Sequence, residues 1–302
     1  MSVITSGSHP KALWPGIAAW FGRKYDEHAT EYTDLFDTET SDKSYEEDVQ
    51  VTGFGLASVK AEGNSVTYDT ETQGFTKRYT HVVYGSGYIV TREEMEDSQY
   101  EVVSKRRAQA LAFAARQTKE NVAANIYNRA ETSGYNGGDG VTLLSTSHPS
   151  LAGNWSNRLT TAADLSEAAL EDLIIQIMGA TNDRGLKISL MPKSLLVPRQ
   201  LWFEANRILK STLQNDTSNN SINALKATGA LPGGVVVNHY LSDADAWFVR
   251  TNAPRGMLHF QRRAYEFVQD NDFDTENAKA KMTERYSFGW TDPRAVYGSL
   301  GA

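Results

Sequence analysis

One stretch of about 40 residues constrains the fold more than any other, because its pattern is that of a single very long helix. No proline or glycine occurs between Thr91 and Gly134. Thr91 can cap the first turn, and four acids follow it where the helix dipole favours negative charge. Apolar residues then recur at spacings of three, four and seven: Met95, Val102, Val103, Ala110, Phe113, Ala114, Val122 and Ile126. The sequence therefore predicts a helix over residues 91–131.

Such a helix would be roughly 60 Å long at 1.5 Å per residue, far beyond the usual three turns. Its apolar stripe is thin and rich in alanine, which suits a spine lying across a sheet or along a neighbouring molecule. A coiled coil is the competing interpretation, but the heptads are too irregular for it.

The residues before this helix are polar and extended. Residues 1–25 mix proline, glycine and tryptophan, and we expect an arm that packs on something else. Residues 26–48 hold ten acids against one base, Lys43. This run is either a solvated face or a segment that meets a basic surface on a partner.

From Asp48 to Thr91, alternating strands and glycine-marked turns predict a long two-stranded excursion. With so few residues to bury, it should depend on neighbouring molecules.

The second half alternates strands and helices, which indicates an α+β or α/β layer. A helix should begin near Asp164, with Glu167 completing a capping box, and end at Gly179 or Gly185. Pro198 should open another helix over residues 199–211. Short strands are expected at residues 188–190, 195–197, 235–237, 246–249, 256–260 and 265–268. A long final strand is expected over residues 279–297.

Motifs for catalysis, cofactors or metals are missing from the sequence. It contains no cysteine, six scattered histidines, and none of the common nucleotide, zinc-protease or serine-hydrolase motifs. Residues 270–274 resemble the start of a calcium loop, but Thr275 and Lys281 replace its glycine and glutamate. We predict no catalytic, cofactor-binding or metal residues, and no cofactor. Four arginines, at 250, 255, 262 and 263, could touch phosphate or form ion pairs.

Charge and hydropathy exclude two further classes. The formal net charge of −7 argues against nucleic-acid binding as the main task. No apolar run approaches the roughly 20 residues that span a bilayer, and residues 1–15 lack a secretory signal pattern. We expect a cytosol-made protein without a membrane partner.

The order of the parts resembles the major capsid proteins of tailed bacteriophages with the Hong Kong 97-type fold, particularly the Mu-like major head subunits. The resemblance covers residues 10–300. It is carried by the segments Tyr45–Val49, Thr52–Leu56, Gly74–Thr76, Tyr79–His81, Ile89–Glu94, Leu196–Pro198, Pro232–Val237, Arg285–Trp290 and Asp292–Arg294. No single motif among them is diagnostic.

The resemblance implies an α+β fold with four parts. These are an N-arm (1–44), an extended two-stranded E-loop (45–90), a peripheral P-domain (91–184 and 276–302) with its spine helix at 91–131, and an axial A-domain (185–275). It implies a non-enzymatic head protein that assembles in the host cytoplasm, as hexamers and pentamers, into an icosahedral virion shell around double-stranded DNA. Portal, scaffold or decoration proteins would be further partners, and DNA would be contacted without sequence specificity.

Contacts between subunits are expected at the hairpin and at a basic triplet. The candidates are Glu46, Glu47, Asp48, Lys60, Lys77, Arg78, Lys105, Arg106 and Arg107. In this interpretation the acidic segment of one subunit meets residues 105–107 of the next. Lys60 and Lys77 have no identifiable asparagine partner, so we predict no covalent cross-link. Two alternatives stay open: an encapsulin-like cargo compartment, and a hydrolase built on the later α/β region.

Overall fold

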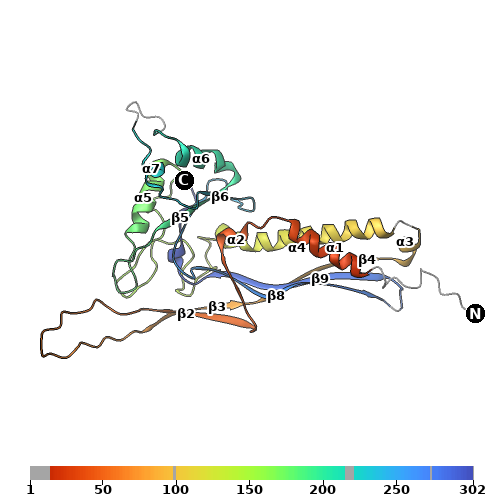
Figure 1. Ribbon diagram of the computed structural model, residues 1–302, viewed down its shortest axis with the longest axis horizontal. Helices are drawn as coiled ribbons and strands as arrows, with labels where there is room; N and C mark the ends of the chain where they lie inside the picture. Colours follow the sequence, from red (N-terminus) through yellow and green to blue (C-terminus); the bar gives the residue numbers. More distant parts are fainter. Residues whose placement is uncertain (1–13, 98–99, 215–220, 273, 302) are drawn as a thin grey trace, which may run out of the picture.

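The computed structural model describes residues 14–97, 100–214, 221–272 and 274–301. It has an elongated domain, a compact domain and a projecting hairpin (Figure 1). The elongated domain contains a four-stranded sheet in the order β1-β8-β9-β4, and the compact domain a four-stranded sheet in the order β10-β7-β5-β6. The hairpin is the two-stranded sheet β2-β3.

Two long antiparallel strands, β8 (Met257–Asn271) and β9 (Ala278–Trp290), form the backbone of the elongated domain. β4 (Val82–Val90) pairs with β9, and β1 (Asp37–Thr40) runs parallel to β8. A short helix, α2 (Tyr32–Leu35), precedes β1.

The predicted spine helix is present as two elements. They are α3 (Arg92–Asp97) and α4 (Tyr100–Asn128), and residues 98 and 99 between them lie outside the described part. The last helical residue is therefore 128, where 131 was expected. α4 lies along one face of the long sheet (Figure 1).

The N-terminal segment is more ordered than the predicted arm. Residues Trp14–Glu27 form a helix, α1, that packs on α4 and β8. Phe21 and Tyr25 are buried there among Leu111, Ala112 and Met282. Packing of this segment on something else was expected from the sequence, but the helix was not, because α1 buries its apolar face only against residues far away in the chain. Residues 1–13 lie outside the described part.

The hairpin consists of β2 (Tyr45–Val51) and β3 (Gln73–Thr80), with residues 52–72 beyond the paired strands. It lies on the side of the long sheet away from α4 (Figure 1). Tyr79 fixes its root, because the ring is buried against Phe260 and over Gly289. The predicted excursion to residue 90 is too long, since residues 82–90 are β4 of the long sheet.

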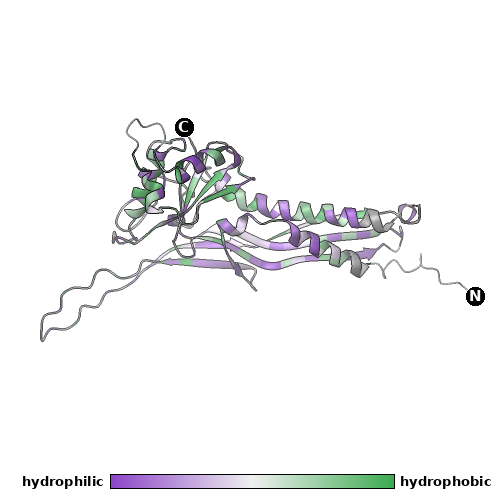
Figure 2. Cartoon of the chain, turned by 45° about the horizontal axis from the view of Figure 1, so that its top comes forward, coloured by the Kyte–Doolittle hydropathy of each residue, from purple (hydrophilic) through white to green (hydrophobic). Residues whose placement is uncertain are grey.

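The compact domain contains strands β5 (Pro192–Pro198), β6 (Val235–Asn238), β7 (Trp247–Thr251) and β10 (Val296–Ser299). One core unites α5 (Glu167–Met178), α6 (Trp202–Lys210) and α7 (Ala224–Thr228) with one face of this sheet. A 3₁₀ turn, η3 (Arg199–Leu201), leads into α6. The opposite face, with Leu196 and Phe248, packs on Tyr127 near the end of α4. Figure 2 shows these strands as mainly hydrophobic, whereas hydrophobic and hydrophilic residues alternate along α4.

Long-range pairing corrects several predicted boundaries. β8, expected in the axial domain as two short strands, is one strand of the long sheet. α5 and β10, expected in the peripheral domain, belong to the compact domain. The expected final strand divides into β9 and β10, because Pro293 opens a 3₁₀ turn, η4 (Pro293–Ala295), between them. Residues 188–190 form no strand, and Ser166 caps α5 in place of Asp164, with its hydroxyl 3.2 Å from the Ala169 amide.

Candidate assembly surfaces

The outer part of the hairpin exposes large hydrophobic side chains to solvent. Val59 is 99% exposed and Tyr68 is 91% exposed, with Phe54, Leu56 and Val66 also exposed. Lys60, a predicted contact residue, is exposed in the same segment. Exposed apolar residues gathered in this way mark an interaction surface. The sequence prediction of a hairpin without its own core agrees with this exposure.

At the hairpin root, by contrast, the predicted contact residues have partners within the chain. Glu47 accepts from Arg78 at 2.8 Å, and the Arg78 guanidinium lies over the ring of Tyr45. Asp48 accepts from the hydroxyl of Thr291 at 2.9 Å.

Glu46 and Lys77 are also held at the root. Glu46 accepts from the hydroxyl of Ser41 at 2.7 Å and from Lys43 at 3.0 Å, and the Ser41 bond is the main reason that the pKa of Glu46 is lowered. Lys77 donates to the carbonyl of Asn136 at 2.7 Å and lies over Trp290, and burial lowers its pKa.

A polar clamp fixes the direction of the hairpin. Arg184 donates to Asp69 at 2.8 Å and also to the carbonyl of Thr70. Gln50 donates to Asp183 at 2.8 Å, and Arg294 donates to the other oxygen of Asp183 at 2.8 Å. Backbone amides of Gly55 and Thr70, followed by Arg184, lower the pKa of Asp69. The loop of residues 181–186 is therefore the support from which the hairpin projects.

Replacing Arg184 by alanine should loosen the hairpin while leaving the rest of the fold intact. We expect amide hydrogen exchange in residues 50–72 of the unassembled subunit to accelerate by roughly tenfold, because loss of the charged hydrogen bonds makes local opening of the hairpin easier. Exchange in β8 and β9 should not change. An Arg207→Ala variant, which removes an exposed pair with Glu204, is the matched control. Equal exchange in the two variants would show that Arg184 does not hold the hairpin.

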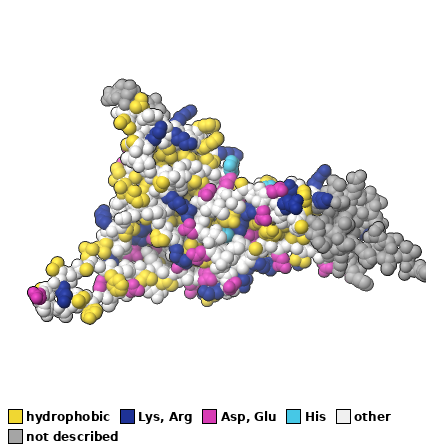
Figure 3. Space-filling model, viewed as in Figure 1, with side chains coloured by type: hydrophobic (Ala, Val, Ile, Leu, Met, Phe, Trp, Pro, Cys, Tyr) yellow, Lys and Arg dark blue, Asp and Glu magenta, His cyan; other side chains and the backbone are white. Residues whose placement is uncertain are grey.

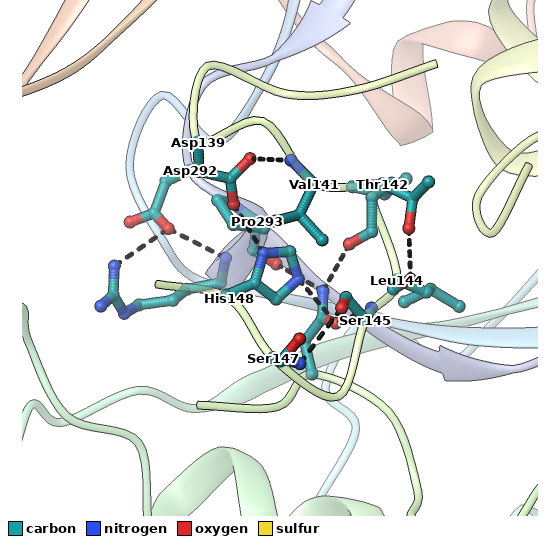
Figure 4. Close-up of polar contacts among 12 residues, drawn as sticks. Asp139, Val141, Thr142, Leu144, Ser145, Ser147, His148, Asp292 and Pro293 are labelled. Atoms are coloured by element: carbon teal, nitrogen blue, oxygen red, sulfur yellow. Dashed lines mark hydrogen bonds and ion pairs between the residues drawn. The ribbon is translucent and has the colours of Figure 1, made fainter. Parts of the chain in front are cut away.

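The clamp rests on a buried polar cluster in the loop that follows α4 (Figure 4). His148 faces Asp139 at 2.7 Å and Asn157 at 3.1 Å. The Asn157 amide nitrogen donates to the carbonyls of Leu143, Pro293 and Val296, which fixes the oxygen of the same amide toward His148. Both ring nitrogens therefore face hydrogen-bond acceptors. The cluster joins residues 134–158 to the segment between β9 and β10.

The basic triplet is only partly available to a neighbour. Arg107 donates to both oxygens of Glu94 in α3. Lys105 is half-buried and engaged in an interaction of its own, whereas Arg106 is exposed. The structure does not bring the triplet near the hairpin candidates within one subunit (Figure 1).

Arginines of the same chain neutralise much of the acidic segment. Arg250 pairs with Asp37 at 2.7 Å, and Arg255 with Glu39 at 2.5 Å and Asp48 at 3.6 Å. Arg262 lies 4.0 Å from Asp42, and Arg263 pairs with Glu266 on its own strand. All four arginines therefore form ion pairs within their own chain. Pairing inside the chain leaves fewer acids for residues 105–107 of a neighbour than the sequence suggested.

A buried charge cluster under α4 was missed by the sequence reasoning. Lys119 lies 2.7 Å from Glu284 and 2.6 Å from the amide oxygen of Gln261, and both charged side chains are 4% exposed. The Tyr25 hydroxyl donates to the second Glu284 oxygen at 2.9 Å. Burial is the main cause that lowers the pKa of Lys119 and raises that of Tyr25. A lysine and a glutamate 165 residues apart carry no signal of this pairing in one sequence.

No metal centre is formed by the described residues, among which no three His, Asp or Glu side chains could share an ion. Asp272 of the calcium-like segment instead accepts from the amide of Asp274 and from Lys279.

An open pocket of about 530 Å³ lies between the hairpin root, α4 and residues 134–136, next to Lys77, Arg129 and Trp290. No helix in the described ranges is both long and apolar enough to cross a membrane.

Solved structures with a similar fold include phage structures and a virus-like particle. The chain is 13% identical to the capsid structure of cyanophage P-SCSP1u, with a TM-score of 0.59 over 91% of this chain and 88% of that one. Mycobacterium phage Che8 gives 14% identity and a TM-score of 0.52, covering 91% and 93% of the two chains. A virus-like particle from Pyrococcus furiosus gives 10% identity and a TM-score of 0.52, covering 95% and 99%. No curated protein matches the chain.

The spine helix on a long sheet, the projecting hairpin and the compact domain together form the Hong Kong 97-type capsid fold. The family model for phage capsid protein matches residues 73–299. The chain belongs to this family and is a major capsid protein, a structural component of a bacteriophage capsid.

Proposed function

We propose that this protein assembles with itself into hexamers and pentamers, and that these close into an icosahedral shell around the double-stranded DNA of a tailed phage. One observation carries the proposal: the hairpin exposes Val59 and Tyr68 almost completely although it has no core of its own. Such surface is costly in water and is stabilised when a neighbouring subunit covers it. Assembly takes place in the host cytoplasm.

Each part of the fold then has a role in the shell. The hairpin of residues 45–80 is the E-loop, and the elongated domain with α4 is the P-domain. The compact domain is the A-domain, which points to the centre of each hexamer or pentamer. Residues 1–44 are the N-arm, even though α1 within it packs on its own subunit. The net charge of −7 suits a wall that encloses DNA without binding it tightly.

Two exposed members of the predicted contact set lie outside the ion pairs of the hairpin root, and we assign these two to the interface between subunits. Lys60 lies in the outer hairpin and Arg106 lies on α4. The root residues Glu46, Glu47, Asp48, Lys77 and Arg78 act indirectly, by holding the hairpin at a fixed angle. Portal, scaffold and decoration proteins are further proposed partners. We also propose that the protein catalyses no reaction and forms no covalent cross-link.

Electron microscopy of the purified full chain tests the assembly proposal. We expect shells, tubes or hexameric rings from the wild-type protein, alone or co-expressed with its neighbouring genes. Monomers under every condition would refute the proposal. Nucleic acid inside particles from infected cells supports the head-protein function, whereas a protein cargo would support the encapsulin-like alternative.

A hairpin variant tests the observation on which the proposal depends. Replacing Leu56, Val59 and Tyr68 together by serine should lower the assembled fraction at least tenfold, because each loses apolar burial worth about 1.5–3 kcal/mol only when a neighbour is present. The unassembled variant should unfold at the wild-type denaturant concentration, since these side chains touch little of their own subunit. Normal assembly of this variant would show that the hairpin surface is not an interface.

A further inference from the structure

Two helices of the compact domain expose hydrophobic side chains and carry opposite charge. On α5, Ile175 is 68% exposed and Met178 is 54% exposed. The same helix contains three acids, Glu167, Glu171 and Asp172, and no lysine or arginine. Just beyond its end, Lys187 donates to the carbonyl of Gly179. We refer to the exposed side of residues 167–178 as the α5 surface.

The second surface is aromatic and basic. On α6, Trp202 is 47% exposed and Phe203 is 67% exposed, and their ring centres lie 5.1 Å apart. Residues 199–210 contain three bases (Arg199, Arg207 and Lys210) and one acid, Glu204, which pairs with Arg207 at 3.1 Å. Exposed tryptophan and arginine are the residue types that dominate binding energy at protein interfaces. This exposed side of residues 199–210 is the α6 surface.

The sheet places these two surfaces on opposite flanks of the domain. In the strand order β10-β7-β5-β6, α5 contacts β10 and β5, whereas α6 contacts β5 and β6. Figure 1 shows the two helices on either side of β5. Hydrophobic side chains gather on the outside of this part of the molecule (Figure 3). Each helix buries its other face in the shared core through Leu173 and Ile177 of α5 and Ala205 and Ile208 of α6.

Two different, complementary surfaces on opposite flanks produce a head-to-tail contact, and repeating that contact by rotation closes a ring. We propose that the α6 surface of one subunit docks on the α5 surface of the next copy of this chain around each ring. The aromatic pair packs against Ile175 and Met178, and the two arginines face Glu171 and Asp172. This inference rests on the proposed assembly and adds the surfaces that drive ring formation.

Charge reversal on each surface tests the contact. The R199E/R207E variant and the E171R/D172R variant should each lower the ring fraction in native mass spectrometry at least tenfold, because like charges then face each other. All four positions are at least partly exposed, so the variants should keep the wild-type circular dichroism spectrum and unfolding midpoint. Normal rings from either folded variant would overturn the inference.

Recombining the variants provides a matched control. A chain that carries all four substitutions has both surfaces reversed, so rings of every size should return. An equimolar mixture of the two double variants can satisfy every contact only by alternation, so it should give hexamers but no pentamers. Failure of the fourfold variant to recover rings would overturn the complementarity. Failure of the wild-type chain to form rings would instead count against the proposed function.

Discussion

Replacing Lys119 by alanine should lower the free energy of unfolding of the unassembled subunit by about 3–5 kcal/mol, the range for breaking a buried ion pair. The variant leaves Glu284 charged and 4% exposed, with only Tyr25 and Gln261 as hydrogen-bond donors. It also removes the ammonium group that lies over the rings of Tyr32 and Tyr286. Guanidinium-induced unfolding of the full chain, below its assembly concentration, measures the change.

Two further variants separate the buried charge from ordinary packing. Exchanging both partners for methionine (K119M/E284M) should recover at least half of the lost stability, because no unpaired charge then remains in the interior. Lys43→Ala, which breaks an exposed pair with Glu46, should leave the unfolding midpoint nearly unchanged. A double variant no more stable than Lys119→Ala would show that the loss comes from packing rather than from the orphaned carboxylate.

Local patterns explain why so much of the fold could be predicted. The long helix is predictable because no glycine or proline occurs between Thr91 and Gly134, and the hairpin because glycines mark its turns. Both patterns depend only on residues that are neighbours in sequence. The order of these elements was enough to predict the fold that the family and the solved structures define.

What the sequence could not supply was pairing across long distances. β4 has the same strand pattern as the hairpin before it, and only its partner, β9, assigns it to the long sheet. α1 carries apolar side chains, among them Phe21 and Tyr25, but their burial depends on α4 and β8, which lie far away in the chain. Several partners of the acidic segment are arginines more than 200 residues away, as Asp37 and Arg250 show.

For the candidate surfaces, too, local features could be predicted from the sequence and long-range contacts could not. Exposure of the outer hairpin was predictable, because a glycine-rich excursion with so few apolar positions cannot bury itself. The engagement of Lys77 by Asn136, and of Arg78 by Glu47, depends on the final packing of the hairpin root. A pattern of charges in sequence therefore marked this region as charged, but it could not separate solvent-facing side chains from internally paired ones.

We expect His259 to make the folded subunit less stable in mild acid. It is 1% exposed, its ring stacks on Phe288 with centres 4.3 Å apart, and its Nδ1 lies 3.2 Å from the hydroxyl of Thr38. Burial first, and then the nearby Lys119 ammonium, lower its pKa from 6.5 to about 3, although Gln261 opposes the shift. The groups around it thus favour the neutral ring, and Nε2 is buried without a partner.

The sign of the effect follows from proton binding. Below pH 6.5 the unfolded chain takes up a proton at His259 that the folded chain refuses, so acid favours unfolding. Each pH unit between 6.5 and about 3 costs about 1.4 kcal/mol, which gives a loss of about 2–3 kcal/mol between pH 6.5 and 4.5.

A His259→Phe variant isolates this contribution, because phenylalanine keeps the ring stacked on Phe288 but binds no proton. Its free energy of unfolding should fall less steeply than that of the wild type over pH 6.5–4.5, by about 2–3 kcal/mol in total. Loss of the Thr38 hydrogen bond lowers the whole curve and leaves this difference in slope unchanged. Guanidinium unfolding at four pH values measures both curves, and parallel curves would show that His259 does not set the acid sensitivity. The His259 ring extends from β8 and contacts Tyr32 of α2 and Phe288 of β9. Protonation of this ring should therefore weaken the packing of α2 against the long sheet.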